Sequence, residues 1–456
     1  MFCESASTSS FFDDFGKAFS ELLPETEGQR IFAEHGPRGG GKPKLTGWQW
    51  LMARVYHAMA KAGSFATHVR QVTGVEISDS ALSQRGQSIG WELLAEVLPA
   101  VLQPLAVEHQ HPAGFHHGMR MVAFDGTRHN LRNTEAINAE AVKNKCSKGS
   151  GQPAFAHLLS VVLVELATHQ PLGAALGWQG EGETTLARRL LEAQGLPTNS
   201  LVLADRLFGS PWLIHLLEPM LRDSGSNWLV RVKANLKAKR GKRLEDGSWL
   251  ATITAIDPTT GRQTEPIRIR EIHAEIRTRK NGQPVRLRFW TGLLDAGTHP
   301  AKELVELYAT RWEEELFFRE LKSHLHGRAN LLSAQTPDTA AEEVLAMLLA
   351  AVLVARQRLA VAQAAGAPVL RISFAQVHQQ TVALCQIFEL GHDLIGPAQR
   401  AEWTRRLVEQ LAATALIQKR RPRSCQRAVR QPVKDWPKMK TPTSVPLNKF
   451  ISITNP

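Results

Sequence analysis

Short apolar runs between residues 119 and 221 alternate with helix-forming segments, and this alternation restricts the fold more than any other feature. The runs MRMVAFDG, HLLSVVLVELA, PLGAALGW and SLVLA have the length and apolar content of buried strands. Good helix formers at residues 184–194, and again at 211–221, predict helices between and after them. Three strands, a helix, a strand and a helix predict an α/β layer arrangement.

Residues 225–296 follow a different pattern. Apolar and polar residues alternate, and the turn sequences DPTTG and KNGQ interrupt them. This pattern is typical of antiparallel strands with one face in solvent. We therefore expect a β-rich insertion. Its first part carries seven cations with no acid among them: Arg231, Lys233, Lys237, Lys239, Arg240, Lys242 and Arg243.

The N-terminal part is expected to be helical. Residues 48–62 and 65–72 have the helical period, the turn TGVEIS follows, and Ser78 is a good N-cap for one helix reading DSALSQRGQSIGWELLAEVL. A helix, a short turn and a second helix with Arg85 on its exposed side would suit a DNA-binding helix-turn-helix. An ordinary small helical bundle is the alternative.

The charge balance predicts a polyanionic partner. The chain has 55 Lys and Arg against 43 Asp and Glu, a formal charge of +12 with His neutral. The segment from residue 419 to 440 has nine Lys or Arg and one Asp, so we expect a disordered basic tail. The apolar residues 344–361 include Arg356 and Arg358, which predicts a buried helix and no membrane span.

The four cysteines form no CxxC pair, which fits a reducing cytoplasm, and the N-terminus does not read as a secretory signal.

Two aspartates each follow an apolar run directly, Asp125 after VAF and Asp205 after LVLA. A single strand-end aspartate often only caps the following turn. Two in one α/β layer, with Glu315 on a later helix, supply three carboxylates. Mg²⁺ prefers hard oxygen ligands, and two such ions about 4 Å apart hold the attacking and leaving oxygens of a phosphoryl transfer. We therefore predict that these three residues form a catalytic metal site.

The segment YATRWEEELFFRELK, residues 308–322, predicts a helix with an unusual polar stripe. At about 100° per residue, a sector of about 60° contains Tyr308, Arg311, Glu315 and Lys322. Apolar residues occupy the other directions. An exposed salt bridge between Arg311 and Glu315, four residues apart, is the simpler alternative.

Together, DGT at Asp125, ADR at Asp205 and this last segment resemble the three blocks of an IS-four family DDE transposase. All four positions of that family's Y-x2-R-x3-E-x6-K signature are filled, by Tyr308, Arg311, Glu315 and Lys322. The resemblance covers roughly residues 119–335. It implies an α/β fold with a ribonuclease-H-like mixed-sheet catalytic core and an antiparallel β insertion, preceded by an all-helical N-terminal domain.

We therefore expect five regions along the chain. They are a helical DNA-binding domain at 1–115, the first part of the core at 116–224, the β-rich insertion at 225–296, the second part of the core with the motif helix and a helical C-terminal region at 297–416, and the basic disordered tail at 417–456.

The resemblance also implies DNA contacts. Arg311 and Lys322 would bind phosphates near the cleaved end, and Tyr308 would bond phosphate or pack against the terminal nucleotide. One branch of the family places a Trp after the motif Arg, as Trp312 is here, and another on the preceding strand, for which Trp290 is a candidate. Either indole could stack on a flipped base, with core packing as the alternative. Arg206, beside the second aspartate, could contact phosphate too.

Histidines give a weaker signal. The pair His116–His117 and the HLH at residues 324–326 lack clustered cysteines and an HExxH helix, so the sequence argues against a zinc site.

The resemblance thus predicts a cut-and-paste DNA transposase that uses two Mg²⁺ ions, with Mn²⁺ able to substitute. Its partners would be the double-stranded DNA of terminal inverted repeats and targets, on which it would act as a homodimer in the bacterial cytoplasm, at the nucleoid and away from membranes. A nuclease with the same core but without strand transfer, or a catalytically silent DNA-binding derivative, is the alternative.

Overall fold

The computed structural model describes residues 15–35, 43–60, 62–140, 155–178, 180–276, 284–325, 331–391, 393–418 and 451–453. The chain forms two compact units. The first comprises Met1–Ala113, Gly126–Leu190 and Glu314–Ile417, and the second comprises Gly114–Asp125, Leu191–Glu313 and Gln418–Pro456. Cys385 is in no disulfide. Cys3, Cys146, Cys425 and residues 419–450 of the basic tail lie outside the described residues.

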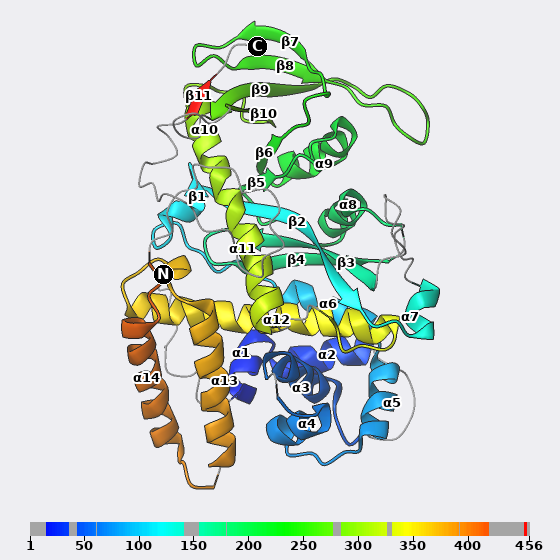
Figure 1. Ribbon diagram of the computed structural model, residues 1–456, viewed down its shortest axis with the longest axis vertical. Helices are drawn as coiled ribbons and strands as arrows, with labels where there is room; N and C mark the ends of the chain where they lie inside the picture. The colour runs from blue at the N-terminus through cyan, green and yellow to red at the C-terminus, as the bar shows by residue number, and fades with distance from the viewer. Residues whose placement is uncertain are drawn as a thin grey trace. The chain divides into compact units, whose positions relative to one another are not determined.

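The first unit is built around α12 (Pro337–Ala364), drawn in yellow in Figure 1. Thr336 begins this helix as a capping box with Thr339, and residues on all of its sides are buried. The helix is long and apolar enough to span a membrane, but 83% of its apolar window is buried inside the structure. The predicted buried helix at residues 344–361 is therefore confirmed.

Helices from both ends of the chain pack around α12. Those that contact it are α1 (Phe15–Leu22), α3 (Gly47–Met59), α6 (Trp91–Val101), α7 (Glu135–Glu140), α13 (Phe374–Leu390) and α14 (Pro397–Thr414). Two more, α2 (Glu25–His35) and α4 (Phe65–Thr73), pack on α3. Arg54 of α3 forms a 2.6 Å ion pair with the buried Glu342 of α12. The helical N-terminal region is thus confirmed, with its core on α12.

The predicted helix after Ser78 is two helices. Ser78 is the N-cap as expected, since its Oγ accepts the backbone N–H of Ala81 at 3.3 Å. The prediction of one continuous helix is wrong, because Gly90 has φ +72° and ψ 161°, which ends α5 (Asp79–Ile89) before α6 begins. A side chain would be strained at this backbone conformation. Arg85 of α5 is half-buried, not exposed as predicted.

Strand β2 (Met119–Leu131) runs from the second unit into the first. In the second unit it pairs in parallel with β5 (Ser200–Ala204), which pairs in parallel with β6 (Asn227–Arg231). In the first unit its His129 bonds Ser160 of β3 (Ala156–Glu165) at 3.0 Å, and β3 pairs antiparallel with β4 (Gln170–Gly177). The strand order is β4-β3-β2-β5-β6. This mixed sheet confirms the fold class expected for the core.

Two helices connect these strands. Helix α8 (Glu183–Gln194) lies between β4 and β5 in the chain, and α9 (Pro211–Asp223) lies between β5 and β6. Ser210 caps α9 by accepting the backbone N–H of Leu213 at 3.2 Å. Apolar residues of α9, among them Leu217, face residues of β5 and β6. The order of strands and helices predicted for residues 119–221 is therefore observed, with one addition: the short helix α7 lies between β2 and β3 and was not predicted.

The insertion extends the sheet of the second unit beyond β6. Its strands are β7 (Lys239–Arg243), β8 (Trp249–Ile253), β9 (Ile267–Ile276) and β10 (Val285–Thr291). They pair antiparallel in the order β6-β10-β9-β8-β7, as the alternating sequence predicts. Strand β11 (Ile451–Ile453) pairs with β9 at its end, so these three residues of the predicted disordered tail are ordered.

Glu271 of β9 is the centre of a buried ionic network in the insertion. Its side chain is 1% exposed and accepts hydrogen bonds from Arg240 at 2.7 Å and from Trp290 Nε1 at 3.0 Å. Arg288 approaches it to 3.4 Å and His273 to 2.5 Å. Burial alone would raise the pKa of Glu271, but these hydrogen bonds outweigh it and lower the pKa to about 2. The carboxylate therefore joins β7, β9 and β10 as an anion.

Replacing this carboxylate should destabilise the insertion. We expect Glu271→Gln to lower the free energy of unfolding by about 2 kcal/mol at neutral pH, because the charge-assisted hydrogen bonds that this buried carboxylate accepts from Arg240 and Trp290 are weakened. The wild-type advantage should be complete above pH 4.5, the unfolded value, and should disappear as the pH falls toward 2. Urea denaturation across this pH range measures both effects.

Glu265→Gln is the matched control, because Glu265 is exposed in the same insertion. It should change stability by no more than about 0.5 kcal/mol. Equal losses in the two variants would contradict the role assigned to Glu271.

Candidate active site

The parallel pairing of β2 with β5 aligns two of the predicted aspartates. The register pairs Ala123 with Leu203, and Asp125 and Asp205 each come two residues later in the chain. Asp205 directly follows β5, as predicted, but Asp125 lies within β2, which continues to Leu131, so the prediction that it ends its strand is wrong. Neighbouring strands lie about 4.8 Å apart, and an equal offset puts both half-buried carboxylates on one face. Two residues separated by 80 positions in the chain are thus adjacent on one face of the sheet.

Tyr308 and Arg311, the first two residues of the predicted motif, contact β5 and β2 within the second unit. Helix α10 (Ala301–Tyr308) ends at Tyr308, whose hydroxyl donates to the carbonyl of Ala204 at 3.1 Å. Arg311 Nη1 lies 3.5 Å from Asp125 Oδ2, and this guanidinium is 12% exposed. Burial raises the pKa of Tyr308, so its hydroxyl keeps its proton and acts as a donor. Tyr308 and Arg311 therefore link α10 to both aspartate-bearing strands.

Local contacts orient the carboxylate of Asp205. The backbone N–H of Arg206 donates to Asp205 Oδ1 at 2.6 Å, while the Arg206 side chain is exposed. Next to them, the rings of Phe124 and Phe208 meet edge to face with centroids 4.6 Å apart. Phe124 directly precedes Asp125, and Phe208 follows Asp205 by three residues. The packing of these buried rings therefore helps to fix the backbone that carries the two acids.

The donor set fits a hard divalent cation. Carboxylate oxygens are the protein ligands that Mg²⁺ prefers, and Asp125 is 24% exposed, which leaves room for water ligands. In the described conformation the guanidinium of Arg311 supplies positive charge beside Asp125. A bound cation would supply this charge in its place, so that Arg311 could turn toward a phosphate.

The motif segment is not the uniform helix that the sequence predicts. A 3₁₀ turn η2 (Ala309–Arg311) follows α10, then α11 (Trp312–Glu320) and a π-helical turn η3 (Leu321–Leu325). The prediction of about 100° per residue is wrong here, because a 3₁₀ turn rotates faster and a π turn slower. The hydroxyl of Thr310 donates to the carbonyl of Leu307 at 2.7 Å within this tightened turn.

Glu315 and Lys322 lie in the first unit, beyond the unit boundary at Glu313. Glu315 is half-buried on α11, one helical turn after Arg311. Lys322 is half-buried in η3, and burial lowers its pKa. Their position beside the two aspartates therefore stays a prediction and is taken up as a proposal below.

The two candidate tryptophans differ in exposure. Trp290 of β10 is fully buried, pairs with Val230 of β6 and donates to Glu271, which is the core-packing alternative. In this conformation no base can reach its ring. Trp312 is half-buried at the start of α11, where part of its surface is accessible. Trp312 is thus the better placed of the two for stacking.

Arg85 lies in the first unit, on a groove between α4 and α5. Groove residues also include Lys44, Arg70, Gln84 and Ser88. Burial lowers the pKa of Arg85, although its Nη1 still approaches Ser88 Oγ at 3.5 Å. The groove has three cations against one acid, Glu76, which lies 3.7 Å from Arg70, so its net charge is positive and compatible with an anionic partner.

Comparison with known proteins agrees with this geometry. A family model described as a transposase DDE domain matches residues 116–353, which include both aspartates and the whole motif segment. Transposase InsG for insertion sequence element IS4, from Escherichia coli (strain K12), is 26% identical over 291 residues. The alignment covers 63% of this chain and 62% of InsG, so the chain spans less than two thirds of the length of that relative. Because the family model spans more than half of this chain's residues, the chain belongs to the DDE transposases, in the IS4 family.

Proposed function

We propose that this chain catalyses cut-and-paste transposition of an insertion sequence by hydrolysing phosphodiesters and joining strands at terminal inverted repeats. The observation that carries the proposal is the register of β2 and β5, which aligns Asp125 with Asp205. Contacts of Tyr308 and Arg311 with the same two strands add the first half of the family motif. Membership in the DDE transposase family supports the reaction class.

In this proposal Asp125, Asp205 and Glu315 hold two Mg²⁺ ions, or Mn²⁺ ions in their place. Asp125 would be shared between the ions, and each of the other two acids would complete one coordination shell. When bound, the ions lower the pKa of the attacking water or 3′-hydroxyl and stabilise charge in the in-line displacement. Arg311, once released from Asp125, would hold a phosphate of the cleaved strand through its planar fork.

Other groups would bind the DNA backbone. Lys322 and Arg206 would contact phosphates, Tyr308 would position the end of β5 and pack near the terminal nucleotide, and Trp312 would stack on a base. Strand β7 presents Lys239, Arg240, Lys242 and Arg243 on an exposed surface. Helices of residues 1–115, with Arg85, would bind the inverted repeats. Two copies would act together on paired DNA ends in the bacterial cytoplasm.

Removing either aspartate should abolish cleavage without abolishing DNA binding. We expect Asp125→Asn and Asp205→Asn each to lower the cleavage rate by at least about 10³-fold, because the metal loses an anionic ligand. Affinity for a DNA end, measured by fluorescence anisotropy, should stay within about threefold of wild type, because phosphate contacts dominate it.

Asp223→Asn is the matched control, since Asp223 is exposed at the end of α9. It should cleave like the wild type. Normal cleavage by Asp205→Asn would refute the proposed metal site.

A strand-transfer assay separates the proposal from its alternatives. DNA ends with a free 3′-hydroxyl, incubated with the protein, a target plasmid and Mg²⁺, should give covalently joined products. Cleavage without joined products would indicate a nuclease with the same core. DNA binding with neither product would indicate a catalytically silent derivative.

A further inference from the structure

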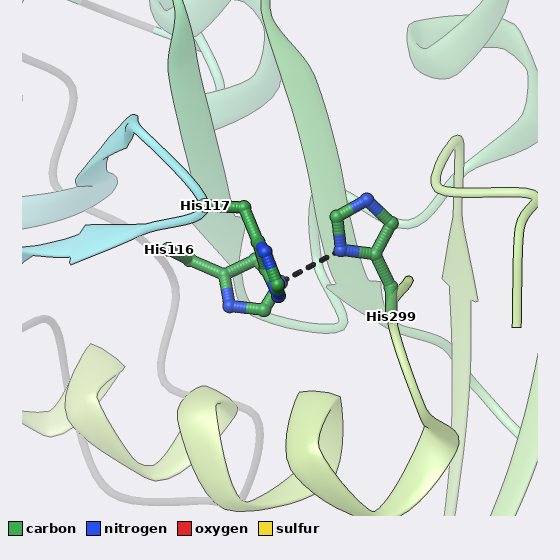
Figure 2. Close-up of side chains that lie close together, drawn as sticks. All are labelled: His116, His117 and His299. Carbon is green, nitrogen blue, oxygen red and sulfur yellow. Dashed lines mark hydrogen bonds between the residues drawn. The ribbon is translucent and has the colours of Figure 1, made fainter. Parts of the chain in front are cut away.

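Three histidines of the second unit form a cluster that the proposed function does not use. His116 ends β1 (Phe115–His116), His117 lies in the turn that follows, and His299 comes from the segment just before α10 (Figure 2). One nitrogen from each ring can be chosen so that the three atoms lie within 4.8 Å of one another. His116 Nε2 and His299 Nδ1 are hydrogen-bonded at 3.0 Å. Sequence reasoning found the first two residues and missed the third, which is 183 positions away.

A carboxylate accompanies the three rings. Glu303, on the first turn of α10, places Oε1 at 3.4 Å from His116 Nδ1 and 3.9 Å from His117 Nε2. Glu303 approaches the His116 nitrogen opposite the one that faces His299, so it can orient this ring while three imidazole nitrogens bind a metal. Three imidazoles, with water as the fourth ligand, are a donor set that zinc binds in proteins. Tetrahedral zinc with bonds near 2.05 Å separates its ligand nitrogens by about 3.3 Å. The three nitrogens, which lie within 4.8 Å of one another, therefore need to approach by at most about 1.5 Å.

The backbone turn at His117 fixes where its ring lies. His117 has φ +48° and Gly118 has φ +78°, and together they form the two-residue turn between His116 and Met119, which pair across β1 and β2. Such a turn favours Asn and Gly, and His is among the few other residues that adopt a positive φ readily. The turn therefore presents the His117 ring beside His116 without large backbone strain.

The buried side chain of Arg270 holds the backbone of His299 in place. Arg270 is fully buried and donates to the carbonyl of His299 at 2.6 Å. It also pairs with Asp246, whose carboxylate accepts the backbone N–H of Ala301 at 2.8 Å. The segment that carries His299 is thus fixed at both sides before any ligand arrives, which lowers the ordering cost of binding.

We propose that His116, His117 and His299 bind one Zn²⁺ ion, with water as the fourth ligand. The site is separate from the catalytic acids, because the six residue steps along strand β2 from Met119 to Asp125 span about 20 Å. The metal would tie the β1–β2 turn to the start of α10. Since the other end of α10 carries Tyr308, and Arg311 follows in η2, this structural zinc would fix the segment that meets Asp125 and Asp205.

Metal binding by the purified full-length protein, without a histidine tag, tests this site. Zinc content is measured by mass spectrometry after dialysis against Zn²⁺ with excess Mg²⁺, which occupies the carboxylate site. We expect one Zn²⁺ per chain in the wild type. Cobalt in its place should give the visible absorption of a tetrahedral site. Zinc should also raise the melting temperature, since it binds the folded state.

Two variants and a control make the test specific. His117→Asn should fold normally, because Asn tolerates a positive φ, and should weaken zinc binding by at least about tenfold. His299→Gln should do the same, whereas His109→Gln, at an exposed histidine outside the cluster, should bind like the wild type. Circular dichroism checks folding.

Failure to bind zinc stoichiometrically, or equal binding by the wild type and both cluster variants, would show a hydrogen-bonded histidine cluster only. Because none of these measurements uses DNA cleavage, that result would leave the proposed function untouched.

Discussion

Parallel pairing of β2 with β5 is the constraint on which the rest of the site depends. It brings two carboxylates side by side on one face of the sheet, where their mutual repulsion must be compensated by nearby positive charge. Arg311 supplies that charge beside Asp125, and it can do so only because α10 ends next to these two strands. The hydroxyl of Tyr308 on the carbonyl of Ala204 fixes this end of the helix.

The insertion has a structural role as well as a basic surface. Its Asp246 accepts the first backbone N–H of α10, and its Arg270 holds the carbonyls before that helix. The Glu271 network keeps the strands that carry these residues together. The helix that brings Tyr308 and Arg311 to the aspartates is therefore held at its start by residues inserted between the second and third blocks of the family motif.

Much of this arrangement was predictable because its signals are local. An aspartate after an apolar run is recognisable within five residues, alternation identifies the antiparallel insertion, and the motif spacing lies within fifteen residues. The end of the strand was not predictable in this way, because β2 continues past Asp125 to Leu131. Contacts between distant segments left no such signal. The sequence does not say that His299 meets His116, or that the hydroxyl of Tyr308 reaches Ala204. The 3₁₀ and π turns around α11 were missed, because helix periodicity assumes one uniform geometry. Gly90 did carry a local signal, since glycine favours the positive φ that divides α5 from α6.

The central claim is that three acids distant in the chain gather around divalent cations. Anomalous diffraction from Mn²⁺ in crystals of the protein with a DNA end tests it most directly. The account predicts manganese within about 2.2 Å of carboxylate oxygens of Asp125 and Asp205, with Glu315 completing the ligand set. Manganese bound elsewhere, or bound by the two aspartates with Glu315 turned away, would contradict it.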